Sequence, residues 1–108
     1  MSKNLTMTVL LDFYGELLTD KQRAALRSYY EEDCSLSEIA ENMGVSRQGA
    51  RDFIKRGEIQ LAEFEEKLGL SKRFARISRC VSEIEAIAEG IDSCERIKLL
   101  TEKIKDNL

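Results

Sequence analysis

The chain has 108 residues, of which 43% are hydrophobic and 34% are charged, and its formal net charge is −3. This length suits one domain, or a small domain with a helical extension, and the absence of proline favours helices throughout. Because no apolar run approaches the ~20 residues that span a bilayer, and acidic Asp12 and Glu16 interrupt the first apolar stretch, we expect a cytoplasmic protein without a signal peptide or membrane insertion.

The first predicted element is a helix over residues 5–18, because its apolar residues recur at helical spacing. Thr19, followed by Gln22, has the capping-box pattern and predicts a second helix that extends to Tyr30. Three acidic residues, 31–33, come next. Negative charge is unfavourable at a helix C-terminus, so we expect a turn there.

Residues 35–56, SLSEIAENMGVSRQGARDFIKR, have the pattern of a helix-turn-helix. Ser35 and Glu38 again have capping-box spacing, and the helix they begin is expected to end at Gly44, where a left-handed residue costs least. Ser46 can then cap a second helix. The alternative is an ordinary helical hairpin with a solvated basic face. Two caps, a glycine turn and a basic second helix together favour the helix-turn-helix.

The apolar positions of this segment agree with that prediction. Ala40 is small where the two helices would cross closely, and Val45 is expected to turn inward after the glycine. Ala50 and Phe53 lie three residues apart and therefore share one face of the second helix.

The polar side chains of the predicted second helix suit DNA. Arginine and glutamine pair with the edges of guanine and adenine, so Arg47, Gln48 and Arg51 are candidates for reading bases. Hydroxyl and basic side chains suit phosphates. The phosphate-binding candidates are Ser46, Lys55 and Arg56, with Lys21, Arg23 and Arg27 from the preceding helix.

Charge is distributed unevenly along the chain. Residues 47–79 contain nine basic and five acidic residues, a balance of +4, whereas the remainder contains eight basic and fifteen acidic residues, a balance of −7. This asymmetry suits a phosphate-facing surface on an otherwise acidic body. The alternative is that the helix faces simply carry mixed charge.

Beyond the motif, one apolar stripe continues for about five turns as far as Gly69 and predicts a long second helix. Ser71 is expected to cap the next helix, and Gly90 and Ser93 to separate it from a last one. The apolar repeat is too short to identify a coiled coil but is sufficient for a helical hairpin over residues 71–108. Its stripes could pack within one chain or between two. We favour a homodimer, since two copies on one duplex are typical of the motif.

The side chains that enzymes and metal sites use are scarce. There is no histidine, and Cys34, Cys80 and Cys94 are too widely spaced to indicate a disulfide framework or a zinc site. We expect Cys80 and Cys94 to be core or interface thiols, and a redox role for Cys34 is an open alternative. Carboxylate pairs such as Glu65–Glu66 are expected to be solvated. We therefore expect no metal, no cofactor and no catalysis.

Several motifs within residues 10–70 resemble the YlxM-type helix-turn-helix proteins of bacteria. They are DFY at 12–14, LLTDKQR at 17–23, SLSEIAE at 35–41, VSRQ at 45–48, IKR at 54–56 and EEKLGL at 65–70. The resemblance implies an all-helical protein whose residues 1–70 are similar to the promoter-reading domain of sigma factors, without a wing. Genes of this family tend to lie beside those of the signal recognition particle and its receptor, which implies a regulatory or accessory role in that pathway.

The chain departs from the family pattern after VSRQ. Members tend to carry a small residue, a valine and an aromatic residue where this chain has Gly49, Ala50 and Arg51. Glycine costs about 1 kcal/mol against alanine inside a helix, yet it allows a backbone to approach DNA closely. Arg51 adds positive charge to the presumed reading face. The resemblance therefore does not imply that this chain shares a target sequence with the family.

These observations predict an all-α helix-turn-helix bundle with a long recognition helix and a C-terminal helical extension. The favoured function is that of a DNA-binding regulatory protein, with duplex DNA as its partner. The alternative is an accessory factor that binds the RNA or protein components of the signal recognition particle and does not recognise a DNA sequence.

Overall fold

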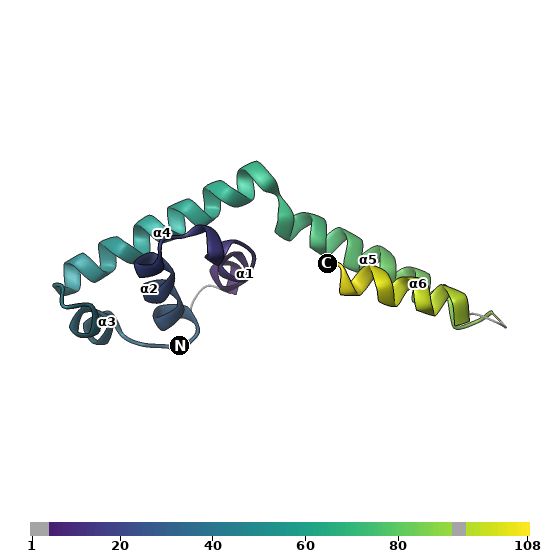
Figure 1. Ribbon diagram of the computed structural model, residues 1–108, viewed down its shortest axis with the longest axis horizontal. Helices are drawn as coiled ribbons and strands as arrows, with labels where there is room; N and C mark the ends of the chain where they lie inside the picture. Colours follow the sequence, from purple (N-terminus) through teal and green to yellow (C-terminus); the bar gives the residue numbers. More distant parts are fainter. Residues whose placement is uncertain (1–4, 92–94) are drawn as a thin grey trace. The chain divides into compact units, whose positions relative to one another are not determined.

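The computed structural model describes residues 5–91 and 95–108, and this part of the chain is helical and contains no strand (Figure 1). The helices are α1 (Leu5–Tyr14), α2 (Asp20–Tyr30), α3 (Leu36–Met43), α4 (Arg47–Leu68), α5 (Leu70–Ala88) and α6 (Glu95–Asp106), with a 3-10 turn, η1 (Gly15–Leu17), after α1. The predicted all-α fold is confirmed. The chain divides into two compact units, residues 1–69 and 70–108.

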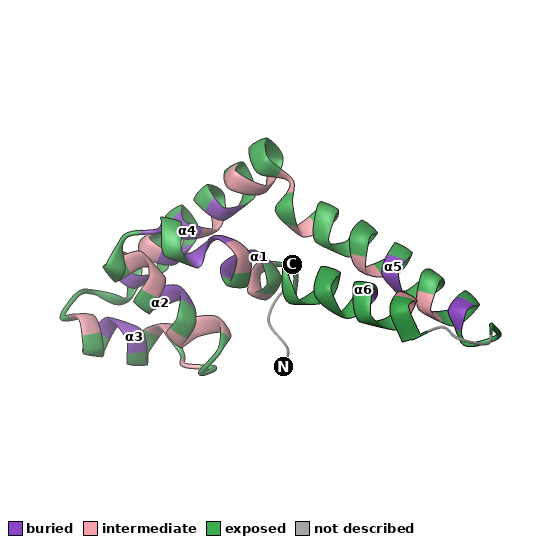
Figure 2. Ribbon diagram, turned by 45° about the vertical axis from the view of Figure 1, so that its right-hand side comes forward, coloured by how far each residue is buried: buried purple, intermediate pink, exposed green. Residues whose placement is uncertain are grey.

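In the first unit, α4 is the helix around which the others are arranged, because α1, α2 and α3 all pack against it. Figure 2 shows the buried positions on the facing sides of these helices. The core consists of Leu10, Leu11, Tyr14, Leu18, Ala25, Leu26, Ile39, Ala40, Ala50, Ile54 and Leu61. One line of α4 residues is thus covered along several turns, while the opposite line faces solvent.

A glycine allows α2 and α4 to approach closely. Gly57 is buried on α4, and a Cβ atom built on it would lie only 2.5 Å from Cδ1 of Leu26. Leu26 is itself completely buried, so it has little room to move. Any side chain at position 57 would therefore force the side chain of Leu26, or α2 with it, to shift.

Two tyrosines tie α4 to its neighbours by polar contacts. The Tyr14 hydroxyl of α1 donates a hydrogen bond of 2.6 Å to Oε1 of Glu65. The Tyr30 hydroxyl of α2 donates to the carboxylate of Glu58. Burial, and then the hydrogen bond to Glu58, raise the pKa of the Tyr30 phenol above its ordinary value. The expectation that Glu65 is merely solvated is therefore wrong.

The second unit is a hairpin of α5 packed against α6. Val81, Ala88 and Thr101 are its buried side chains among the described residues. The Thr101 hydroxyl donates to Oε2 of Glu85 over 3.0 Å, and Nζ of Lys105 lies 2.9 Å from Oε1 of the same carboxylate. The bonds from Lys105 and then from Thr101 lower the pKa of the Glu85 carboxyl. This polar cluster connects the two helices beside a small apolar contact.

Three local expectations are wrong. The first helix ends at Tyr14, because residues 15–17 tighten into a 3-10 turn. α5 begins at Leu70 directly after Gly69, whose left-handed φ of 61° ends α4 in a single residue, so Ser71 lies inside α5 and is not its cap. Cys80 is exposed on α5, so the expectation of a core thiol is wrong there, and the alternative of an interface thiol stays a prediction.

Part of the sequence-based prediction concerns residues that the structure does not describe. Ser93, the expected break between the last two helices, and Cys94, an expected core or interface thiol, lie outside the described residues. Within the described ranges, no helix is both long enough and apolar enough to cross a membrane.

Replacing Gly57 by valine should destabilise the protein, because the added methyl groups would overlap with Leu26 in a filled core. We expect a loss of about 1–3 kcal/mol in the free energy of unfolding, measured by urea denaturation. Ala62→Val is the matched control, since Ala62 is exposed on the same helix and surface changes usually stay within about 0.5 kcal/mol. Equal stability of the two variants would contradict the close contact between α2 and α4.

The Tyr30 phenol should make stability depend on alkaline pH. Its folded pKa lies above the unfolded value of about 10. Its contribution is therefore complete below that pH and is lost as the pH rises toward the folded value. In urea titrations from about pH 8 to 11, roughly two units below to one unit above the unfolded pKa, the free energy of unfolding of wild type should decrease relative to that of Tyr30→Phe once the pH exceeds about 10. A difference that stays constant throughout would exclude this linkage.

Candidate nucleic-acid interface

The local signals that predicted the helix-turn-helix are confirmed in atomic detail. Ser35 Oγ accepts from the backbone N–H of Glu38 over 3.1 Å, and the Glu38 carboxylate accepts from the N–H of Ser35 over 2.9 Å, which completes a capping box. Gly44 ends α3 with a left-handed φ of 68°. Ser46 Oγ accepts from the N–H of Gly49 over 3.0 Å and so caps α4.

The cap of α2 is simpler than predicted. Thr19 Oγ1 accepts from the backbone N–H of Gln22 over 3.2 Å, as expected for an N-cap. The side chain of Gln22, however, accepts a 3.3 Å hydrogen bond from the Thr19 hydroxyl through its Oε1. Glutamine therefore does not make the return bond to the backbone that a complete capping box requires.

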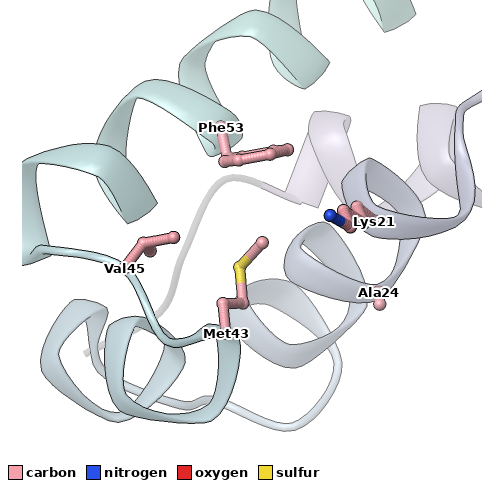
Figure 3. A pocket seen from close by; sticks show the side chains of 5 residues that line it. All are labelled: Lys21, Ala24, Met43, Val45 and Phe53. Carbon is pink, nitrogen blue, oxygen red and sulfur yellow. The ribbon is translucent and has the colours of Figure 1, made fainter.

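A shallow apolar pocket of about 170 Å³ lies where α2, α3 and α4 meet, and it is lined by Lys21, Ala24, Met43, Val45 and Phe53. Figure 3 shows Met43, Val45 and Phe53 converging on it, with Lys21 of α2 beside them. Val45 keeps 38% of its surface exposed. The expectation that it turns inward is therefore only partly met, because the pocket that receives it is open to solvent.

The three candidates for base reading come together on the exposed side of α4. Arg47, Gln48 and Arg51 line one shallow hollow of about 270 Å³ with Leu36, the first residue of α3. Arg51 and Lys55 also line the next hollow along the helix, which has a volume of about 230 Å³. The side chains of Arg47, Gln48, Arg51 and Lys55 form a polar strip along the first turns of α4. Leu36, at the start of α3, borders this strip.

The remaining phosphate-binding candidates are arranged differently. Ser46 is exposed, but its hydroxyl already caps α4. Arg56 is exposed on α4, and its guanidinium carbon lies 5.6 Å from the ring centroid of Phe53, within range of a cation–π interaction. Lys21 borders the pocket on the Phe53 side of α4.

Arg23 and Arg27 are already engaged by carboxylates. Arg23 lies 3.0 Å from Glu16 and 2.7 Å from Asp20. Arg27 lies 3.8 Å from Glu16 and 3.9 Å from Glu31. The two pairs with Glu16 tie α2 to the 3-10 turn that precedes it, and all four pairs reduce the positive charge that α2 offers to an anion.

The sequence-based reasoning overlooked an acidic residue on the basic face. Asp52 is exposed, and its Oδ1 accepts a 3.0 Å hydrogen bond from Nε2 of Gln48. Glutamine and aspartate four residues apart on a helix are a known stabilising pair, so their spacing was the available signal.

The described residues offer little for metal-dependent chemistry. Within ranges 5–91 and 95–108, no group of three or more His, Cys, Asp or Glu side chains is placed to hold a metal ion. The candidate site on α4 is a polar surface with basic side chains.

The chain is similar to known proteins of one family over most of its length. The model of the family UPF0122, described as "Putative helix-turn-helix protein, YlxM / p13 like", matches residues 1–102. A UPF0122 protein of Thermoanaerobacter sp. (strain X514) is 51% identical over 88 residues, covering 82% of this chain and 73% of the relative. One of Listeria welshimeri is 44% identical over 106 residues, covering 98% and 91%. One of Halalkalibacterium halodurans is 41% identical over 104 residues, covering 96% and 95%. The chain belongs to the YlxM-like helix-turn-helix family UPF0122.

Proposed function

We propose that this protein is a DNA-binding regulatory protein that reads duplex DNA with the first turns of α4. The observation that carries the proposal is the shared hollow of Arg47, Gln48 and Arg51 beside the start of α3. The opposite side of α4 is held in the core, so these side chains project from a fixed support. A fixed helix with a polar outer face is what entry into a major groove requires.

The chemistry of each side chain on this surface suits a specific contact with DNA. Arg47 and Arg51 suit bidentate hydrogen bonds to guanine, and Gln48 suits adenine. Lys55 follows on the same face and suits a phosphate, as does Arg56 toward the side of Phe53.

We assign secondary phosphate contacts to the other phosphate-binding candidates. Ser46 and Lys21 lie at the edges of the surface and are assigned to phosphates. Arg23 and Arg27 would have to exchange their carboxylate partners for phosphates, so we assign them a secondary contribution.

α4 is long enough for its first turns to contact DNA while its later turns pack in the first unit. Its 22 residues extend over about 33 Å at 1.5 Å per residue. A major groove about 12 Å wide accommodates only part of such a helix. The later turns carry Leu61, which is buried, and Glu65, which accepts the Tyr14 hydrogen bond. The first turns are thus available to DNA, while the later turns anchor the helix in its own unit.

We further propose that the protein acts as a homodimer through its second unit. The hairpin buries few side chains and leaves Ile77, Ile84, Leu100 and Ile104 between 40% and 46% exposed. Ile77, Leu100 and Ile104 line one open hollow of about 570 Å³, so both helices contribute to the same apolar surface. A second copy of this surface would cover it, and two copies would allow two half-sites on one duplex.

The DNA proposal can be tested by fluorescence anisotropy across a salt series. The probes are duplex from upstream of the protein's own operon, scrambled duplex and signal recognition particle RNA. Arg47→Ala and Arg51→Ala should each lose about 1–3 kcal/mol of discrimination between the duplexes. Lys55→Ala should weaken both duplexes alike and reduce the salt slope by about 0.9.

Lys67→Ala is the matched control for this experiment, because Lys67 is an exposed lysine in the last turn of the same helix. It should leave both affinity and salt slope unchanged. Duplex binding that is insensitive to all these substitutions would refute the assignment of α4. Binding to the RNA alone would select the accessory factor of the signal recognition particle instead.

The dimer can be tested by sedimentation equilibrium. Ile104→Glu places a charge in the apolar hollow and should shift the protein toward the monomer, because a buried unpaired charge is costly. Leu99→Glu is the control, since Leu99 is an exposed leucine of the same helix that does not line the hollow. Circular dichroism would verify that both variants stay helical. A wild type that sediments as a monomer would rule out the proposal.

A further inference from the structure

Asp52 is the one acidic residue in the first ten positions of α4, among four basic side chains. Within the first turns of α4 it is flanked by Arg51 and followed by Lys55 and Arg56. A carboxylate there repels phosphates and lowers affinity for any nucleic acid. A surface that served only to bind phosphates would be expected to lack it.

The geometry gives this carboxylate a specific contact. Nε2 of Gln48 donates to Oδ1 of Asp52 over 3.0 Å, between two exposed side chains one helical turn apart. A carboxylate can only accept hydrogen bonds. The amide of Gln48 must therefore turn its NH2 group, and not its carbonyl oxygen, toward Asp52. The contact thus fixes the orientation of the Gln48 amide, with its NH2 group toward Asp52.

The orientation leaves a defined pattern of hydrogen-bonding groups on Gln48. One N–H is used by Asp52, and the second N–H and the carbonyl oxygen stay available. Adenine offers an acceptor at N7 and a donor at N6, and a glutamine amide matches both at once. Gln48 also lines the hollow shared with Arg47 and Arg51, so the oriented amide lies among the other base-reading candidates.

The carboxylate also discriminates against some bases directly. In the major groove, O6 and N7 of guanine and O4 of thymine are acceptors, and they repel a carboxylate. The amino groups of adenine and cytosine are donors, and they suit it. Asp52 thus opposes guanine and thymine, two of the bases that Gln48 does not match.

We infer that Asp52 is a specificity-determining residue, whose carboxylate orients Gln48 toward adenine and lowers general affinity for DNA in exchange for sequence discrimination. The inference rests on the proposed function. A glutamine–aspartate pair that only stabilised the helix would have no effect on which sequence is bound, and this difference makes the inference testable.

The contact is tested first in the free protein. In ¹⁵N-labelled protein, the side-chain NH2 resonances of Gln48, assigned with Gln48→Ala, should differ between wild type and Asp52→Asn, which has nearly the same shape but no charge at this position. Glu63→Gln, which removes a charge later in α4, should leave these resonances unchanged. Resonances of Gln48 that are the same in wild type and Asp52→Asn would overturn the orienting contact, whatever the protein binds.

The consequence is tested by selection from a pool of randomised duplexes, followed by anisotropy on the selected duplex and on its single-base variants. Asp52→Asn should bind unselected duplex more tightly than wild type. It should also lose roughly five- to hundred-fold of the preference at one A·T pair, the range expected for one bidentate contact. Glu63→Gln removes the same charge from an exposed position later in α4 and should retain the wild-type preference.

The outcomes separate the two proposals. If wild type selects a sequence and Asp52→Asn prefers it equally, the part given to Asp52 is wrong and DNA binding stands. If wild type selects no sequence and binds no duplex, the DNA-reading function is wrong, and the part given to Asp52 is overturned with it. Melting curves of all variants would ensure that a lost preference does not reflect unfolding.

Discussion

The burial of one line of residues on α4 constrains the whole first unit. Ala50, Ile54 and Leu61 are between 0% and 4% exposed, and α4 packs against α1, α2 and α3. Burying an isoleucine or leucine side chain contributes about 1.5–3 kcal/mol, so rotation of α4 about its axis would be costly. The direction in which Arg47 and Gln48 point is set by this packing.

Polar contacts restrict the position of α4 further than apolar packing does alone. Tyr14 and Tyr30 bond to Glu65 and Glu58 on α4, across 51 and 28 positions of the sequence. Hydrogen bonds are directional, whereas apolar burial is not, so these pairs define how far α4 can slide past α1 and α2. A helix held in both respects can present its free side chains reproducibly, which any sequence reader needs.

Under the proposed function, the exposed face of α4 combines attraction to DNA with discrimination between sequences. Basic side chains attract any phosphate backbone, whereas the formal charge of −3 on the whole chain opposes non-specific binding. Asp52 lies within the basic face and hydrogen-bonds to Gln48. The same balance appears on α2, where Glu16 neutralises part of the charge of Arg23 and Arg27.

Features that depend on neighbours a few residues apart follow from the amino-acid sequence alone. The caps at Ser35 and Ser46 and the left-handed Gly44 each involve groups within one helical turn, so the helix-turn-helix and the exposed polar strip of α4 could be predicted. Features that depend on distant neighbours follow from tertiary packing. The tyrosine–glutamate pairs, the early end of α1 at Tyr14 and the partial exposure of Val45 all depend on which helices meet. Periodicity states which face of a helix is apolar, but the partner that covers it is chosen by packing across the whole chain.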